Sequence, residues 1–180
     1  MGLFKKATPP HQTALAMIGA RAGNRVLVAG HPDPGVVAEL ARTTGLNGQT
    51  LIALAPDSRA AYDAAAASAG VFLETLDLPA SPLRLPDTAG DHDVVVLHID
   101  LLTRDDATRA ALAHDAFARL RRGGRVVVIE GRPSKGWFGG RPATIDADSI
   151  VRWLDAAGGL AARALGTADG VSYFEARKAR

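Results

Sequence analysis

The stretch DHDVVVLHIDLLTRDDATRAALAHDAFARLRRGGRVVVIE, residues 91–130, decides the fold of this chain. It predicts a strand over residues 93–97, a helix that stops at Gly123-Gly124, and a second strand over residues 126–129. Both strands are continuous apolar runs without polar alternation, which is typical of strands buried on both faces of a parallel sheet. Thr103-x-x-Asp106 resembles a capping box before the helix. The stretch therefore predicts a strand–helix–strand unit of an α/β domain.

The rest of the chain repeats this alternation of strand and helix. Gly45 and Gly70 end two of the helices, and Asp57 or Ser58 is expected to cap the helix between them. The further predicted strands are residues 24–29, 50–55, 71–76, 160–165 and 171–176, and the further predicted helices are residues 9–21, 34–44, 59–69 and a last one capped by Asp146 or Asp148.

This order of elements predicts a doubly wound, mixed seven-stranded sheet with helices on both faces. The terminal pair of strands is joined by a tight turn, G-T-A-D-G, so the last strand is expected to be antiparallel. We expect residues 1–22 to form an N-terminal tail and short helix, and residues 23–180 to form a single domain. A chain of 180 residues is long enough to bury a substantial core.

The pattern D-V-V-V, helix, R-L-x-x-G-G-R-x-x-x-x-E resembles the second half of a class I S-adenosylmethionine-dependent methyltransferase. The resemblance covers residues 23–178, and it looks closest to the small ubiquinone/menaquinone-biosynthesis-like group. It implies S-adenosyl-L-methionine as the cofactor. Ligands in such sheets bind at the carboxyl ends of the strands, near the switch in strand order.

The turn after the first strand departs from the family pattern. Methyltransferases carry an acidic residue and G-x-G-x-G there, whereas this chain has V-L-V-A-G-H-P-D-P-G, with Val28 at the acidic position. Gly30 matches the first glycine and Gly35 the last, with His31 and Asp33 between them. The resemblance implies that these four residues bind the cofactor. Two prolines in the turn remove two N–H donors.

The nucleoside end of the cofactor would meet the turns after the second and third strands. The resemblance places the acidic residue for the ribose at Ala55, so Asp57, two residues later, is the candidate, although it could instead cap a helix. It places the adenine contact at Ser81. Three acidic anchors are therefore missing or displaced, and each charged hydrogen bond is worth about 1.5–3 kcal/mol. A strongly diverged site or a non-catalytic descendant would show this pattern.

His98 and Asp100 follow the fourth strand, where the family places residues that face the transferred methyl group. Methyl transfer depends mainly on alignment and desolvation, and a base such as His98 helps when the acceptor is a hydroxyl or carbon acid. Both residues could instead be ordinary loop residues. His31, Asp33 and His98 could converge on a metal, but without tight spacing no metal site is expected.

Trp137 and Phe138 lie in a glycine-rich loop flanked by Arg132, Lys135 and Arg141. We expect this aromatic pair to contact a substrate or a partner protein, or to cover the cofactor cleft. A contact with a membrane surface and a position folded back against the sheet edge are the alternatives.

Composition narrows the class of protein further. The chain has no cysteine and a formal charge of +2, with small basic clusters that suit solvated surfaces, so no specific nucleic-acid partner is indicated. It shows no apolar run long enough for a membrane helix and no signal peptide, so we expect a cytoplasmic location. Peripheral membrane contact and the oligomeric state stay open.

Three functions are compatible with the sequence. The first is a diverged S-adenosylmethionine-dependent methyltransferase that acts on a small molecule or on an acceptor presented by a partner. The second is a non-catalytic methyltransferase-like subunit that binds or assembles a larger complex. The third is a dinucleotide-binding oxidoreductase, because G-H-P-D-P-G is a broken form of G-x-G-x-x-G.

Overall fold

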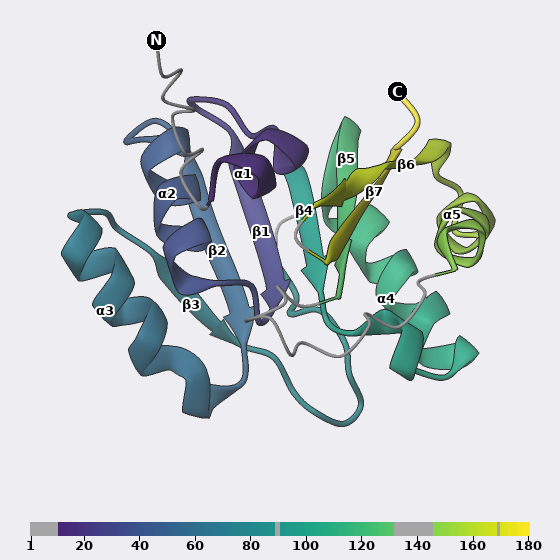
Figure 1. Cartoon of the computed structure of the whole chain (residues 1–180), viewed down its shortest axis with the longest axis horizontal. Coiled ribbons are helices and arrows are strands. Elements are labelled where there is room, and N and C mark those ends of the chain that lie inside the picture. The colour runs from purple at the N-terminus through teal and green to yellow at the C-terminus, as the bar shows by residue number, and fades with distance from the viewer. Residues whose placement is uncertain (1–10, 89–90, 132–145, 169) are drawn as a thin grey trace, which may run out of the picture.

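The computed structural model of this chain describes residues 11–88, 91–131, 146–168 and 170–180. They form a seven-stranded sheet in the order β3-β2-β1-β4-β5-β7-β6 (Figure 1). Among the described strands, β7 runs antiparallel to both of its neighbours and the remaining pairs are parallel, as predicted. The strands are β1 Arg25–Gly30, β2 Gln49–Leu54, β3 Glu74–Asp77, β4 His92–His98, β5 Leu120–Glu130, β6 Leu160–Ala168 and β7 Val171–Arg177.

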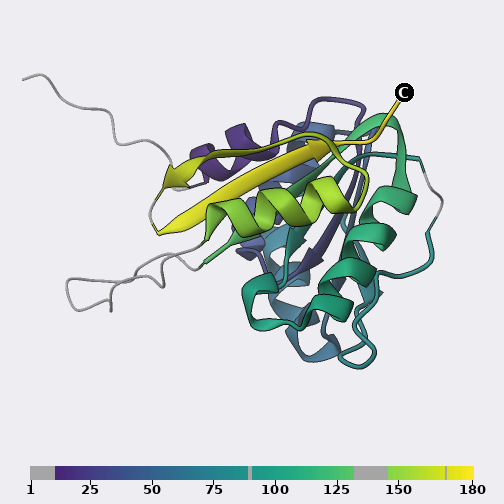
Figure 2. The same cartoon turned by 90° about the vertical axis from the view of Figure 1, so that its right-hand side faces the viewer.

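Helices cover both faces of the sheet, which confirms the predicted architecture (Figures 1 and 2). Alternate residues of β1 divide the core: Val26 and Val28 pack toward α1, α2 and α3, while Leu27 and Ala29 pack toward α4 and α5. The helices are α1 Gln12–Ile18, α2 Pro34–Thr44, α3 Arg59–Ala69, α4 Asp106–Arg119 and α5 Ala147–Ala156, with short 3-10 turns η1 Pro56–Ser58 and η2 Leu101–Thr103. No helix among the described residues is long and apolar enough to cross a membrane.

Several predicted boundaries are wrong. The third strand begins at Glu74, where it first pairs with Leu51 of β2, and not at residue 71. Helix α4 ends at Arg119, and the glycine pair lies inside β5 instead of ending the helix. A Cβ at Gly124 would lie 3.0 Å from the carbonyl oxygen of His92, so this glycine lets β5 approach β4 closely.

The helix caps also differ in part from the sequence prediction. Asp105, and not Thr103, caps α4 by accepting a hydrogen bond from the N–H of Thr108. Asp146 caps α5, which is one of the two predicted alternatives. Ser58 holds the cap position of α3 but makes no side-chain cap bond.

The proline-rich loop between β3 and β4 is fastened to α4 by a buried carboxylate. Asp115 accepts two hydrogen bonds of 2.6 Å from the Arg84 guanidinium and one of 3.2 Å from the N–H of Leu85. Arg119 adds a 2.9 Å bond to the carbonyl of Pro86. Burial raises the pKa of Asp115, but these donors outweigh it and hold the pKa below its ordinary value. The loop therefore has a fixed course without regular secondary structure.

Candidate functional site

The strand order reverses between β1 and β4, and the carboxyl ends of these strands meet at one edge of the sheet (Figure 1). Ligands of doubly wound sheets bind in the crevice at such a switch point. The carboxyl ends of β1, β2, β4 and β5 all lie at this edge, and the segments after β1, β2 and β4 follow directly from it. They carry most of the site residues that the sequence predicts.

Gly30 is required by the packing of the two central strands. Its φ is 107°, and a Cβ there would overlap the carbonyl oxygen of His98 and lie 2.7 Å from the carbonyl carbon. The same carbonyl accepts a 3.1 Å hydrogen bond from the N–H of His31. The glycine therefore lets β1 end directly against β4, a reason that is independent of any ligand.

Asp33 occupies the N-terminus of α2. Its Oδ1 accepts a 2.8 Å hydrogen bond from the N–H of Gly35 and a 3.4 Å bond from the N–H of Val36. The imidazole of His11 lies over Gly35, where a Cβ would be 2.7 Å from its Nε2. The turn therefore presents a carboxylate at this helix end. His11 could not be predicted as a site residue, because it lies outside the motif.

Tyr62 on α3 contacts the proline-containing turn that follows β1. Its buried hydroxyl donates a 2.6 Å hydrogen bond to the carbonyl of Pro32. Burial, with a smaller effect of the Asp33 charge, raises the pKa of Tyr62 to about 12, so the hydroxyl stays a donor at neutral pH. Tyr62 was not a predicted site residue; the signal in the sequence is one tyrosine in a helix made mostly of alanine.

The structure brings together His31, His98 and Asp100. The Nε2 of His31 lies 3.3 Å from Oδ2 of Asp100, and the rings of His31 and His98 stack with centroids 5.1 Å apart. His98 is 7% exposed, and its Nε2 lies 3.1 Å from the carbonyl oxygen of Gly131. His31 is therefore the more accessible of the two rings. No group of three or more potential metal ligands is found within the described ranges.

The backbone of Asp100 is strained. Its φ of 50° and ψ of 55° place it in the left-handed region, which is uncommon for residues other than glycine. Such conformations persist where the surrounding structure enforces them, and they concentrate at functional sites. The turn that begins at Asp100 is therefore held in place by its contacts.

Two carboxylates lie at the edge formed by β2 and β3. Asp57 is exposed in η1 and makes no helix-cap bond, although Ser58 Oγ donates to it at 3.4 Å. Asp77 ends β3 opposite Leu54 and pairs with Arg59 at 2.9 Å. Asp77 was missed because the third strand was predicted to end one residue earlier, and its signal is an acid directly after the end of a predicted strand.

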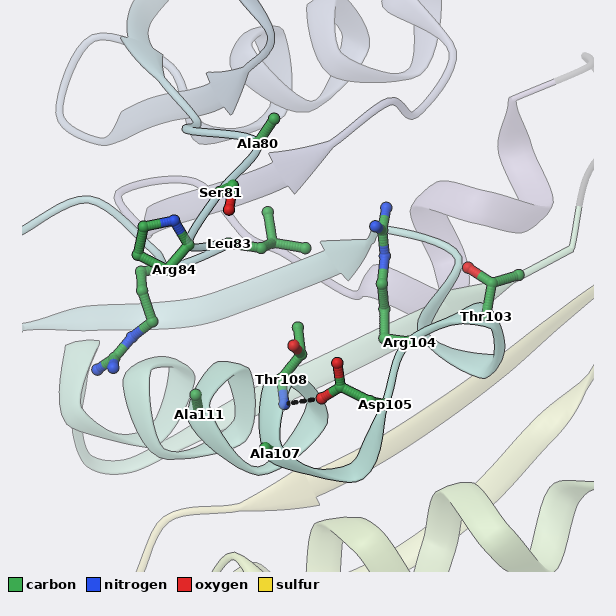
Figure 3. Close-up of a pocket in the computed structure, with 11 residues that line it drawn as sticks. Ala80, Ser81, Leu83, Arg84, Thr103, Arg104, Asp105, Ala107, Thr108 and Ala111 are labelled. Carbon is green, nitrogen blue, oxygen red and sulfur yellow. Dashed lines mark hydrogen bonds between the residues drawn. The ribbon is translucent and has the colours of Figure 1, made fainter.

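Ser81 lines a groove of about 480 Å³ between the proline-rich loop and the start of α4 (Figure 3). Thr103, Arg104 and Thr108 line the opposite side, and the Arg104 side chain extends away from α4. The groove thus joins a predicted nucleoside contact to the turn that follows Asp100. Trp137 and Phe138 lie outside the described residues.

Comparison with solved structures identifies the fold. The chain has the fold of the class I S-adenosylmethionine-dependent methyltransferases. It is similar to the methyltransferase SibL, with 19% identity, a TM-score of 0.72, and coverage of 95% of this chain and 55% of SibL. It is also similar to a methyltransferase from Aquifex aeolicus, with 14% identity, a TM-score of 0.68, and coverage of 93% and 88%.

A third similar structure is a putative O-methyltransferase from Nostoc punctiforme, with 18% identity, a TM-score of 0.72, and coverage of 94% of this chain and 56% of that one. The chain thus spans slightly more than half the length of SibL and of the Nostoc protein, and most of the Aquifex protein. No protein-family model matches the chain, and no curated protein matches it.

Proposed function

We propose that this chain is a diverged S-adenosylmethionine-dependent methyltransferase that acts on a hydroxyl group of a small or partner-presented acceptor. The observation that carries the proposal is the contact between His31 and Asp100 at the switch point of a methyltransferase fold. Similar structures from Nostoc punctiforme and Thermotoga maritima are named as O-methyltransferases, a reaction in which the acceptor loses a proton.

The charges along this edge suit a cationic cofactor. S-adenosylmethionine, when bound, would supply an electrophilic methyl group from its sulfonium. The Asp33 carboxylate, which is 58% exposed, would hold the ammonium of its methionine end. Asp57 and Asp77 would accept from the ribose hydroxyls, and Ser81 would contact the base.

The paired histidine would take the proton of the acceptor. Because Nε2 of His31 faces the Asp100 carboxylate, the neutral ring carries its proton there and leaves Nδ1 as the acceptor atom. The ring of His98 stacks against that of His31 and would limit its movement. In this proposal His31 is the base, Asp100 orients it, and His98 supports both.

Substitution of His31 by glutamine is expected to lower kcat about 10²–10⁴-fold, as for the loss of a general base. The measurement is transfer of a labelled methyl group from S-adenosylmethionine to a panel of phenols and aliphatic alcohols. His114→Gln is the matched control, since His114 is an exposed histidine on α4 and should leave the rate unchanged. Equal rates for wild type and His31→Gln would refute the role of His31.

Cofactor binding is tested by calorimetric titration with S-adenosylmethionine and S-adenosylhomocysteine, with NAD(H) as the control ligand. Gly35→Val should abolish binding and leave the thermal midpoint of the apo-protein within a few degrees. The nearest atoms to an added Cβ belong to the His11 and Asp33 side chains, which can move, and not to the backbone. If Gly35→Val binds the cofactor as well as wild type, this turn does not hold it.

A non-catalytic, methyltransferase-like binding subunit is the second candidate, favoured by a different observation. Asp33 already occupies the helix N–H groups, and His11 fills the space above Gly35. If neither wild type nor His11→Ala binds either ligand, the binding-subunit function replaces the enzymatic one. The Asp33 carboxylate also opposes a dinucleotide, since a pyrophosphate would need those same N–H groups.

A further inference from the structure

Glu130 is a buried carboxylate to which the proposed reaction assigns no part. It ends β5, it is 2% exposed, and its Oε1 accepts a 2.7 Å hydrogen bond from the N–H of Leu101. No ion pair to Glu130 is present in the described part of the chain. Burying the charge of a carboxylate is costly, so the hydrogen bond from the η2 backbone is the described contact that offsets this cost.

The groups that Glu130 binds form the start of η2. Leu101 directly follows Asp100, and its N–H is the donor that Glu130 binds; the N–H of Leu102 is near enough to lower the pKa of the same carboxylate. The far end of this turn returns to Asp100, whose carbonyl accepts from the N–H of Thr103 at 3.0 Å and from its Oγ1 at 2.8 Å. Asp100 is thus fixed from both ends of η2 in its left-handed conformation.

Burial and the neighbouring charges together set the direction of the Glu130 pKa shift. Burial raises the pKa of Glu130, the N–H of Leu101 lowers it, and the Asp100 charge raises it again, so that the pKa lies above its ordinary value. From β1 and β4 the titratable neighbours of this turn are His31, which contacts Asp100, and His98, which stacks on His31. The neighbouring carboxylate therefore adds to the cost of an ionised Glu130.

We propose that Glu130 is a positioning residue: by binding the start of η2 it sets the orientation of Asp100, and through Asp100 it fixes which nitrogen of His31 carries the proton. The effect on methyl transfer rests on the function proposed above. The effect on the His31 ring does not, because it concerns the protein without ligand.

Glu130→Gln tests the proposal. Glutamine keeps the size but removes the charge and replaces one acceptor oxygen with an NH2 donor, so the hold on the N–H groups at the start of η2 is weakened. Nitrogen-15 NMR of the His31 ring at alkaline pH should show mainly the Nε2–H tautomer in wild type and a mixture in Glu130→Gln. With an active enzyme, kcat should fall about 10²-fold while KM changes little, since a misplaced group costs rate more than binding.

Asp105→Asn is the matched control, because this exposed carboxylate caps α4 just beyond η2 and shares no hydrogen bond with Glu130, Asp100 or His31 among the described residues. It should leave the His31 tautomer unchanged. If Glu130→Gln does not fold, Glu130→Asp, which draws the carboxylate back from the N–H of Leu101, takes its place: a mixed tautomer supports the proposal and an unchanged one overturns it.

The two proposals fail separately. A folded Glu130→Gln that keeps the wild-type tautomer overturns the role of Glu130, even if methyl transfer is observed. If wild type transfers no methyl group, the proposed function falls. A tautomer shift in Glu130→Gln still establishes the link from Glu130 to His31.

Discussion

Gly30→Ala is expected to lower the free energy of unfolding by at least about 4 kcal/mol, a large part of the roughly 5–15 kcal/mol that stabilises a typical domain. The added Cβ would overlap the backbone carbonyl oxygen of His98, so β1 and β4 must separate at the centre of the sheet. The φ of 107° adds backbone strain. Denaturant unfolding, or the soluble fraction if the variant does not fold, measures the effect.

Gly23→Ala separates the steric effect from backbone strain. Gly23 also has a positive φ, of 81°, but a Cβ there would meet nothing within 4 Å. We expect this variant to lose only about 1–2 kcal/mol, the cost of a left-handed alanine. Similar losses in the two variants would show that the contact between β1 and β4 relaxes easily.

Asp115→Ala is expected to cost about 2–4 kcal/mol of folding stability, because it removes charged hydrogen bonds and leaves the buried N–H of Leu85 without its acceptor. The proline-rich loop that carries Ser81 would then detach from α4. Increased protease cleavage within residues 78–88 is the second readout. Asp106→Ala, at an exposed position of the same helix, should change stability by no more than about 0.5 kcal/mol.

This contribution depends on pH in a defined direction. The folded pKa of Asp115 is lowered, so its ionised form stabilises the fold above the ordinary aspartate value of about 3.9, and the stabilisation is lost as the pH falls through the folded value. The difference between wild type and Asp115→Ala should therefore shrink below about pH 4. A difference that stays constant down to acid unfolding would contradict the ion pair as its source.

The secondary structure was largely predictable because its causes are local. Continuous apolar runs such as residues 94–97 can satisfy their burial only inside a sheet covered on both faces, and glycine after a helix favours the left-handed cap seen at Gly70. The errors at Glu74 and Gly124 arose where the neighbouring strand, and not the local sequence, decides where a strand begins or how closely it packs. An edge strand begins where its neighbour offers hydrogen bonds, and a glycine inside a strand is explained by an adjacent backbone.

The candidate site was predictable only in part. The positions of His98 and Asp100 after β4 follow from the pattern, because residues after parallel strands gather at one edge. The residues that contact them in the folded structure do not follow from this pattern. His31 meets Asp100, Tyr62 meets Pro32, and Glu130 meets Leu101, across long separations in sequence.

The sequence by itself determined the alternation of strands and helices and the class of fold, because hydrophobic periodicity and turn residues act over a few neighbouring positions. The tertiary structure alone decided the order of the last strands, with the buried β7 between β5 and the more exposed β6. It also decided what surrounds Gly35 in the turn after β1. Whether Gly35 faces open space or the ring of His11 depends on how α1 packs against α2, and no local pattern encodes such a contact.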